Sequence, residues 1–221
     1  MSLITVEQLK RDHEVDVYLS SSTRYLSQIG YTEHGKRHAT LVSELAASVL
    51  REMSFPQREW ELAAIAGYLH DIANMINRFN HGGAGAIMAY QILTRLRMPP
   101  EEIAVVISAI GNHEEERGNS VNAVAAALIL ADKSDVHRSR VTNSDFATFD
   151  IHDRVNYAAE SSALTVETGQ RAVRLELTIN TRICPVMEYF EIFLARMIMC
   201  RRAAEFLDYR FGLIINGNPL L

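Results

Sequence analysis

Apolar residues recur at helical spacing through most of this chain, and this periodicity limits the fold more than any other feature. From Thr5 to about Arg140, every apolar stretch fits a helix. Capping and proline residues divide the region into segments, because Thr5 with Gln8 makes a capping-box pattern and Pro99 with Pro100 separates two helices. The predicted helices cover about residues 5–30 with a break near 20–22, 33–53, 56–69, 82–97, 100–112 and 122–140.

The pattern changes after about residue 145. Two stretches there alternate apolar and polar residues around a turn, which predicts a β-hairpin, and a long helix and a final strand follow. The predicted elements are strands at 163–166, 172–179 and 211–215 and a helix at 185–207. The predicted fold is therefore mainly α, a helical bundle over residues 1–145 with a small α+β appendage (β-β-α-β) over residues 146–221. No linker rich in Pro, Gly or Ser separates them, so we expect them to pack together.

Composition and charge exclude several classes of protein. The 221 residues are 48% hydrophobic and carry a net charge of −5, which argues against a nucleic-acid duplex or an anionic membrane as the partner. The N-terminus lacks the apolar core of a signal peptide, and the longest apolar run, residues 123–131, is far shorter than the roughly 20 residues that cross a membrane. These features predict a cytoplasmic protein.

The late helix carries both cysteines and a heavily apolar surface. Cys184 and Cys200 are predicted to lie on it as buried thiols, too far apart for a disulfide. Apolar side chains wrap more than one face of this helix, so it is either buried within the chain or forms a homodimer contact. They are Met187, Phe190, Phe193, Met197 and Met199.

Four histidines and two aspartates are spread through the helical region in otherwise apolar surroundings. They are His38, His70, Asp71, His81, His113 and Asp132. Asp132 ends the run Ala-Leu-Ile-Leu-Ala and would be buried, and an unpaired buried carboxylate is so costly that it requires a partner. A cation is the simplest partner for imidazoles and carboxylates that converge from different helices, and the mixed donor set favours Fe, Mn, Co or Zn.

The order and the local text of these residues resemble the HD-domain superfamily of metal-dependent phosphohydrolases, in its six-ligand, binuclear H…HD…H…H…D branch. The motif texts are Gly35-Lys36-Arg37-His38, Leu69-His70-Asp71-Ile72-Ala73, His81-Gly82-Gly83-Ala84-Gly85-Ala86, Asn112-His113-Glu114-Glu115 and Leu130-Ala131-Asp132-Lys133. The resemblance covers about residues 30–140 and leaves the C-terminal appendage outside it. A second His-Asp pair at His152-Asp153 shows that the dipeptide alone is weak, whereas the ordered set is specific.

The resemblance implies a bundle of five or more helices that holds two divalent metal ions, iron or manganese first, with zinc, cobalt, nickel or magnesium as alternatives. Carried over by position, the first site takes four residues, and Asp71 bridges to the second. The implied ligands are His38, His70, Asp71 and Asp132 for the first metal, and Asp71, His81 and His113 for the second. Each imidazole needs an acceptor for its other nitrogen, for which Glu114, Glu115 and Asp135 are candidates.

Two close cations would deprotonate a bridging water near neutral pH and neutralise the phosphoryl oxygens. The predicted function is therefore hydrolysis of a phosphate ester or anhydride of a nucleotide or a similar small molecule, with Asp71 and Lys133 as catalytic residues. The predicted substrate-binding cations are Lys36, Arg78, Lys133 and Arg138, with Arg37 and Arg140 as further candidates.

Two other histidine positions have weaker assignments. His34 lies four residues before His38 and is predicted on the helix surface, with a role in the site as the alternative. His152-Asp153 is predicted to be a chance match to the His-Asp motif with no role in the metal site. The alternative is a position at the edge of the substrate site. The text after His113 lacks the Gly-Tyr-Pro of the cyclic-di-GMP phosphodiesterases, so we do not expect that substrate. The text around His81 is loosely similar to enzymes that cleave dinucleoside polyphosphates.

Two functions from other classes stay open at this point. The same six-ligand order resembles the di-iron HD oxygenases, such as myo-inositol oxygenase, which activate O2. A non-catalytic metal- or nucleotide-binding regulatory module, with the C-terminal appendage as its contact to a partner, is the other. Iron-specific activity with oxygen uptake would indicate the oxygenase. Tight nucleotide binding without turnover, or the absence of metal even after reconstitution, would indicate the binding module.

Overall fold

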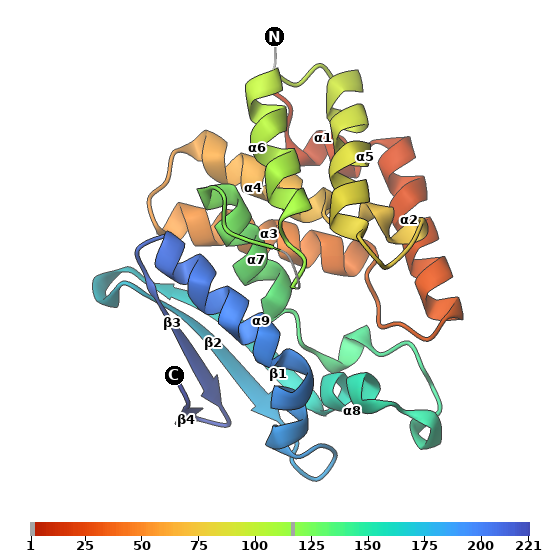
Figure 1. Cartoon of the computed structure of the whole chain (residues 1–221), viewed down its shortest axis with the longest axis vertical. Coiled ribbons are helices and arrows are strands. Elements are labelled where there is room, and N and C mark those ends of the chain that lie inside the picture. The colour runs from red at the N-terminus through yellow and green to blue at the C-terminus, as the bar shows by residue number, and fades with distance from the viewer. Residues whose placement is uncertain (1–2, 116–117) are drawn as a thin grey trace.

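The computed structural model describes residues 3–115 and 118–221, and its helices cluster in the first two thirds of the chain (Figure 1). The helices are α1 (Val6–Lys10), α2 (His13–Gln28), α3 (Lys36–Glu52), α4 (Gln57–Leu69), α5 (His81–Arg95), α6 (Pro100–Gly111), α7 (Ala123–Ser134), α8 (Ile151–Ala158) and α9 (Val186–Phe206). Short 3₁₀ helices cover Ile72–Met75, Arg138–Arg140, Phe146–Thr148 and Thr168–Gln170. The prediction of a mainly α fold with a small C-terminal sheet is confirmed.

Helix α7 forms the centre of the structure. Every residue from Val124 to Ser134 is buried, as expected for a helix that is apolar on all sides. It packs against α3, α4, α6 and α9. Because the polar residues Asp132 and Lys133 stand in its last turn, the burial of α7 carries both of them into the interior.

Helices α3 and α4 approach each other closely at Gly67. A Cβ atom on Gly67 would lie 2.8 Å from the Cα of Ser43 and 2.9 Å from the carbonyl oxygen of Val42. The Ser43 hydroxyl donates a hydrogen bond of 2.8 Å to the carbonyl oxygen of Ala64. This contact holds the middle of α3 against the last turns of α4, just before the His-Asp pair.

Four strands form the C-terminal sheet, in the order β1-β2-β3-β4. The strands are β1 (Ala159–Glu167), β2 (Ala172–Ile179), β3 (Arg210–Ile215) and β4 (Asn218–Pro219). β1 and β2 form the predicted antiparallel hairpin, and β2 and β3 are parallel because α9 connects them. Helix α9 lies across one face of the sheet (Figure 1). Buried apolar residues of the sheet and of the bundle form one continuous core cluster.

Several predicted helix boundaries are wrong. The first helix is two, and it breaks at Asp12 rather than near Ser20–Ser22, because the Asp12 carboxylate caps α2. The sixth ends at Ser134 instead of Arg140, where Asp135 leaves the helical conformation. α8 and β4 were not predicted from the sequence pattern.

Most of the apolar side chains predicted for helix α9 are buried within the chain. Phe193, Met197 and Met199 are buried, whereas Met187 is exposed. Both cysteines are buried free thiols, as predicted, but Cys184 lies just before α9 rather than on it. Among the residues described, α9 included, no helix has the length and apolar character needed to cross a membrane.

Candidate metal centre

The ends of five elements meet at one buried point and bring the six predicted residues together there. His38 lies in the first turn of α3, the His-Asp pair follows α4, His81 begins α5, His113 follows α6, and Asp132 lies in the last turn of α7. All six are buried, with His38 and His70 fully inaccessible. Residues spread over about 95 positions of sequence thus form one cluster.

The carboxylate of Asp71 divides the cluster into two halves. Its Oδ2 lies 3.5 Å from His38 Nε2 and 3.4 Å from His70 Nε2, while its Oδ1 lies 3.2 Å from His81 Nε2 and 3.8 Å from His113 Nε2. Asp132 adds Oδ1 to the first half, 3.2 Å from His38 Nε2. Each oxygen of Asp71 therefore faces a different pair of histidines.

Backbone carbonyls fix the orientation of three imidazoles. The Nδ1 of His70 donates to the Gly67 oxygen at 2.8 Å, and the Nδ1 atoms of His81 and His113 make equivalent bonds to residues three positions earlier, at 2.8 and 2.6 Å. Because a carbonyl oxygen only accepts, each Nδ1 carries the proton. The Nε2 atom of each ring, which carries a lone pair in the neutral form, therefore points into the cluster.

These lone pairs meet at short distances. His38 Nε2 lies 3.2 Å from His70 Nε2, and His81 Nε2 lies 3.0 Å from His113 Nε2. Asp71 Oδ2 is fully buried and accepts no hydrogen bond from the residues described. Facing lone pairs and an orphaned carboxylate oxygen need a proton or a cation between them, so the donor set fits metal ions that accept both imidazole and carboxylate.

The close approach of charged groups shifts the pKa values of several residues of the cluster. Burial alone would raise the pKa of Asp71, but His70 and His81 lower it well below its usual range. Burial likewise opposes ionisation of Asp132, yet Lys133, His38 and His70 hold its pKa low. Burial would lower the pKa of His70, but the carboxylates of Asp71 and Asp132 raise it to about 10. Without metal, a proton on His70 therefore compensates the carboxylates.

Two of the three predicted outer acceptors hold imidazoles. The Nδ1 of His38 donates to Asp135 Oδ2 at 2.7 Å, and Glu114 Oε1 lies 2.9 Å from the Nδ1 of His81. Glu115 instead pairs with cations, at 2.6 Å from Arg196 Nε and 3.5 Å from Lys133 Nζ. Arg196 and Lys133 lower the pKa of Glu115 against the effect of its burial.

Two of the four predicted substrate-binding cations lie at the cluster. Arg78 Nη1 lies 3.1 Å from His81 Nε2 and 3.5 Å from Asp71 Oδ1. Lys133 Nζ lies 2.7 Å from Asp132 Oδ2.

The other cations are engaged elsewhere. Lys36 is exposed and pairs with Asp16 of α2, and Arg138 pairs with Glu160 at 3.1 Å. The further candidates Arg37 and Arg140 surround Asp135, with Arg37 Nη2 2.8 Å from its Oδ2 and Arg140 Nη1 2.8 Å from its carbonyl oxygen.

His34 lies inside the site rather than on a helix surface, which corrects its prediction. α3 begins at Lys36, so His34 precedes the helix, and its Nδ1 donates to the Thr32 oxygen at 2.7 Å. It is buried, and its ring centroid lies 5.6 Å from that of His38. Burial, reinforced by Arg78 and Arg140, lowers its pKa well below the usual value.

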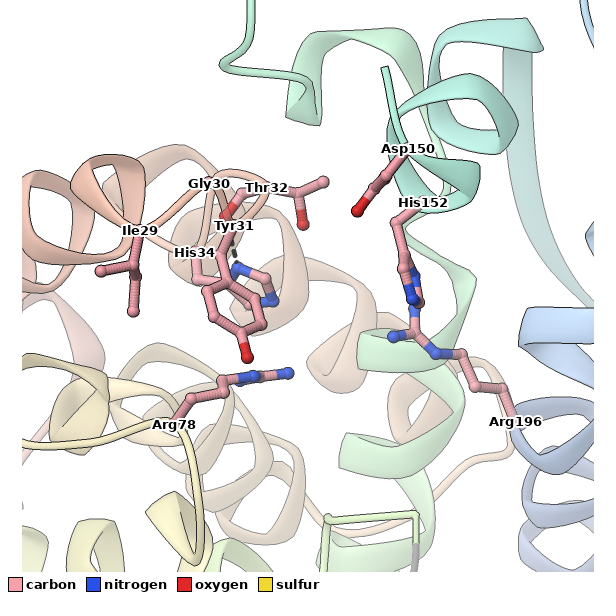
Figure 2. A pocket seen from close by; sticks show the side chains of 9 residues that line it. All are labelled: Ile29, Gly30, Tyr31, Thr32, His34, Arg78, Asp150, His152 and Arg196. Carbon is pink, nitrogen blue, oxygen red and sulfur yellow. Dashed lines mark hydrogen bonds between the residues drawn. The ribbon is translucent and has the colours of Figure 1, made fainter. Parts of the chain in front are cut away.

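A cavity of about 430 Å³ opens beside His34 (Figure 2). Its lining includes Arg78, and also His152 of the second His-Asp pair and Arg196 of α9. Asp153, by contrast, is buried away from it and accepts a hydrogen bond from Asn143 at 3.3 Å. Arg196 was missed from the sequence, because it stands in an apolar helical pattern with no motif around it.

Comparison with known proteins agrees with this geometry. Residues 32–137 match the HD domain family. The chain is also similar to the uncharacterized protein MJ1020 of Methanocaldococcus jannaschii, with 26% identity over 199 residues that cover 79% of this chain and 75% of that protein. The region that matches the HD domain family, residues 32–137, contains all six residues of the cluster.

Proposed function

We propose that this chain, which contains an HD domain with a buried His/Asp cluster, is a metal-dependent phosphohydrolase acting on a small phosphate ester or anhydride, such as a nucleotide. One observation carries the proposal. Imidazole lone pairs and two carboxylates converge on a point beside a cavity whose lining includes His81, Lys133 and Arg78. A chain with a net charge of −5 thus places cations where a phosphate would approach a metal centre.

The two halves of the cluster would hold two divalent ions, with iron or manganese preferred by the mixed imidazole and carboxylate donors. The first set is His38, His70, Asp71 and Asp132, and the second is Asp71, His81 and His113. Two such ions supply an activated water nucleophile and neutralise charge on the phosphoryl oxygens.

Positioning of the ligands and binding of the substrate are assigned to side chains of this chain. Asp71 links the two donor sets, since each of its oxygens faces a different pair of histidines. Arg78 and Lys133 approach the cluster with donors 3.5 Å from Asp71 and 2.7 Å from Asp132, where they can bind phosphoryl oxygens and orient the substrate. Buried surroundings strengthen these charge interactions relative to water.

Metal content and hydrolysis test the proposal together. The full chain is purified anaerobically without an affinity metal column, analysed for metal, and assayed for phosphate release from nucleotides and p-nitrophenyl phosphate with added Mn²⁺ or Fe²⁺. We expect about two ions per chain and metal-dependent release.

Asp71→Asn should abolish phosphate release, while Asp145→Asn, at an exposed position, should retain it. Absence of bound metal after reconstitution, or release that Asp71→Asn leaves unchanged, would overturn the proposal. Iron-dependent oxygen uptake without phosphate release would replace it with the oxygenase.

A further inference from the structure

The cavity beside the metal centre lies between two walls that come from different parts of the chain (Figure 2). Residues 29–32, His34 and Arg78 form the wall on the helical side. Asp150, His152 and Arg196, from the start of α8 and from α9, form the opposite wall. The C-terminal appendage therefore faces the metal centre across this cavity.

Arg196 is held with its terminal nitrogens toward this space. Its Nε lies 2.6 Å from Glu115 Oε1, and its guanidinium carbon lies 4.3 Å above the centroid of the Phe193 ring. Figure 2 shows the side chain reaching into the cavity beside His152, with its guanidinium pointing toward the opposite wall. Glu115 and Phe193 thus hold Arg196 on one side, while its guanidinium extends into the cavity.

Two arginines line the cavity from opposite walls. Arg78 projects into it from the opposite wall, and the hydroxyl of Tyr31 points toward Arg78 (Figure 2). Asp150 is the one carboxylate in this lining as described, and its Oδ1 already accepts from the backbone N–H of Asp153 at 2.8 Å. An anion therefore suits this space better than a neutral group does.

A second hollow of about 300 Å³ adjoins this cavity and is lined by His81 of the cluster. Its lining shares Tyr31, Arg78 and Arg196 with the first and adds His81, Lys133 and two glutamates. The glutamates are already paired, Glu114 with His81 and Glu115 with Arg196 and Lys133. An extended anion could therefore contact the cluster at one end and Arg196 at the other.

We propose that Arg196, with His152 beside it, forms a second anion site that binds a phosphoryl group other than the one at the metal centre. The inference rests on the proposed function and narrows it, because the substrate class becomes compounds with two or more linked phosphoryl groups. The fork of a guanidinium binds phosphoryl oxygens through two parallel hydrogen bonds, which explains an arginine at this position.

Binding of two probes that differ by one phosphoryl group tests the second site. Adenosine 5′-monophosphate and the cleavage-resistant adenosine 5′-(α,β-methylene)diphosphate are titrated into the full-length, Mn²⁺-loaded chain with Mn²⁺ in excess, and heat is recorded. We expect the diphosphonate to bind more tightly. Arg196→Ala should weaken it by about tenfold or more and change monophosphate binding less than twofold.

Three further variants serve as controls for this experiment. His152→Gln, at an exposed position, should weaken the diphosphonate selectively and to a smaller extent, and Arg196→Lys should restore part of the affinity. Arg201→Ala, an exposed arginine of the same helix that pairs with Glu205, should change neither affinity. Thermal unfolding of each variant shows whether it folds.

The outcomes separate this inference from the proposed function. Equal binding of the two probes, no binding of either, or an equal loss for both in Arg196→Ala overturns the second site even if the chain hydrolyses phosphate compounds. A selective loss in a chain that hydrolyses nothing supports the second site and removes the hydrolase.

Discussion

The Nδ1 of His38 donates a hydrogen bond of 2.7 Å to Oδ2 of Asp135, and this bond aims the Nε2 of His38 at both carboxylates of the cluster. Asp135 is buried and is held in turn by Arg37, whose Nη2 lies 2.8 Å from the same oxygen. Together with Arg140, these contacts keep the pKa of Asp135 far below its usual range despite its burial. A charged chain of contacts therefore runs from the protein surface to the metal donors.

Replacement of Asp135 by Asn should weaken metal binding by roughly 10–100-fold, because an acceptor of this kind fixes the ring and raises its basicity. Calorimetric titration with Mn²⁺ measures the effect, and Asp145→Asn, at an exposed carboxylate, serves as the control. Circular dichroism must show an intact fold, since the variant leaves Arg140 buried near an uncharged group. An unchanged affinity in a folded variant would contradict the role of Asp135.

Loss of one histidine should remove one ion rather than both. In His81→Ala, the donors of the first half remain, so elemental analysis should find about one ion per chain in place of about two. Asp71→Ala removes the carboxylate that serves both halves and should reduce the content further. If His81→Ala retained the metal content of the parent chain, the second half of the cluster would not hold an ion.

Metal binding should release protons and strengthen as pH rises. Burial disfavours the charged form of His70, but Asp71 and Asp132 raise its pKa to about 10, so the metal-free ring is protonated at neutral pH. An ion binds the neutral ring, and affinity should therefore increase by up to about tenfold per pH unit below pH 10. Titrations in two buffers of different ionisation enthalpy give the number of protons released, and identical heats in both would contradict this expectation.

The carboxylate of Asp12, which caps α2, should contribute to the free energy of unfolding at neutral pH and lose this contribution in acid. Asp12 Oδ1 accepts from the backbone N–H groups of Glu14 and Val15, and Arg95 Nη2 lies 2.8 Å from Oδ2. Burial alone would raise the pKa of Asp12, but Arg95 and the capped N–H groups lower it below 3.8. A lowered pKa stabilises the fold above the unfolded value, and this contribution is lost as pH falls through the folded value.

Asp12→Ala should therefore lower the free energy of unfolding by about 1 kcal/mol at pH 7. Urea unfolding at pH 7 and pH 3 measures it, and the gap between parent and variant should narrow at the lower pH. A gap of the same size at both values would show that the carboxylate charge is not responsible.

Gly67→Ala should destabilise the chain by about 1–3 kcal/mol, because its Cβ would overlap the backbone of Ser43 and Val42 and force α3 and α4 apart. The same shift would move the carbonyl that orients His70, so metal affinity should fall as well. Gly169→Ala is the matched control, since a Cβ there meets nothing within 4 Å. Equal unfolding temperatures for the two variants would contradict the close approach.

The cluster was predictable because its members stand in a fixed order at the ends of apolar runs. Such runs form buried helices, so His70 and Asp132 had to enter the interior with the chain around them. The alternating pattern predicted the hairpin for a similar reason, since one face of β2 is buried and the alternate residues of β1 are half-buried.

Tertiary contacts account for what the sequence pattern did not predict. The pattern favours a helix from Glu33, but a Cβ at Gly35 would overlap Thr23 of α2, and α3 begins only at Lys36. His34 is therefore in a loop and turns inward. Arg196 reaches the site through Glu115, about 80 positions away in sequence, and no local spacing encodes such a contact.

Every donor of the metal cluster lies before residue 136, whereas the wall that faces it begins at Asp150. Substitutions in α8 and α9 therefore alter the far side of the cavity without changing any donor. In evolutionary terms, the proposed metal ligands and the proposed second anion site stand in different parts of the chain. On these proposals, substitutions in the C-terminal third could change the substrate while the histidines and aspartates of the first two thirds stay the same.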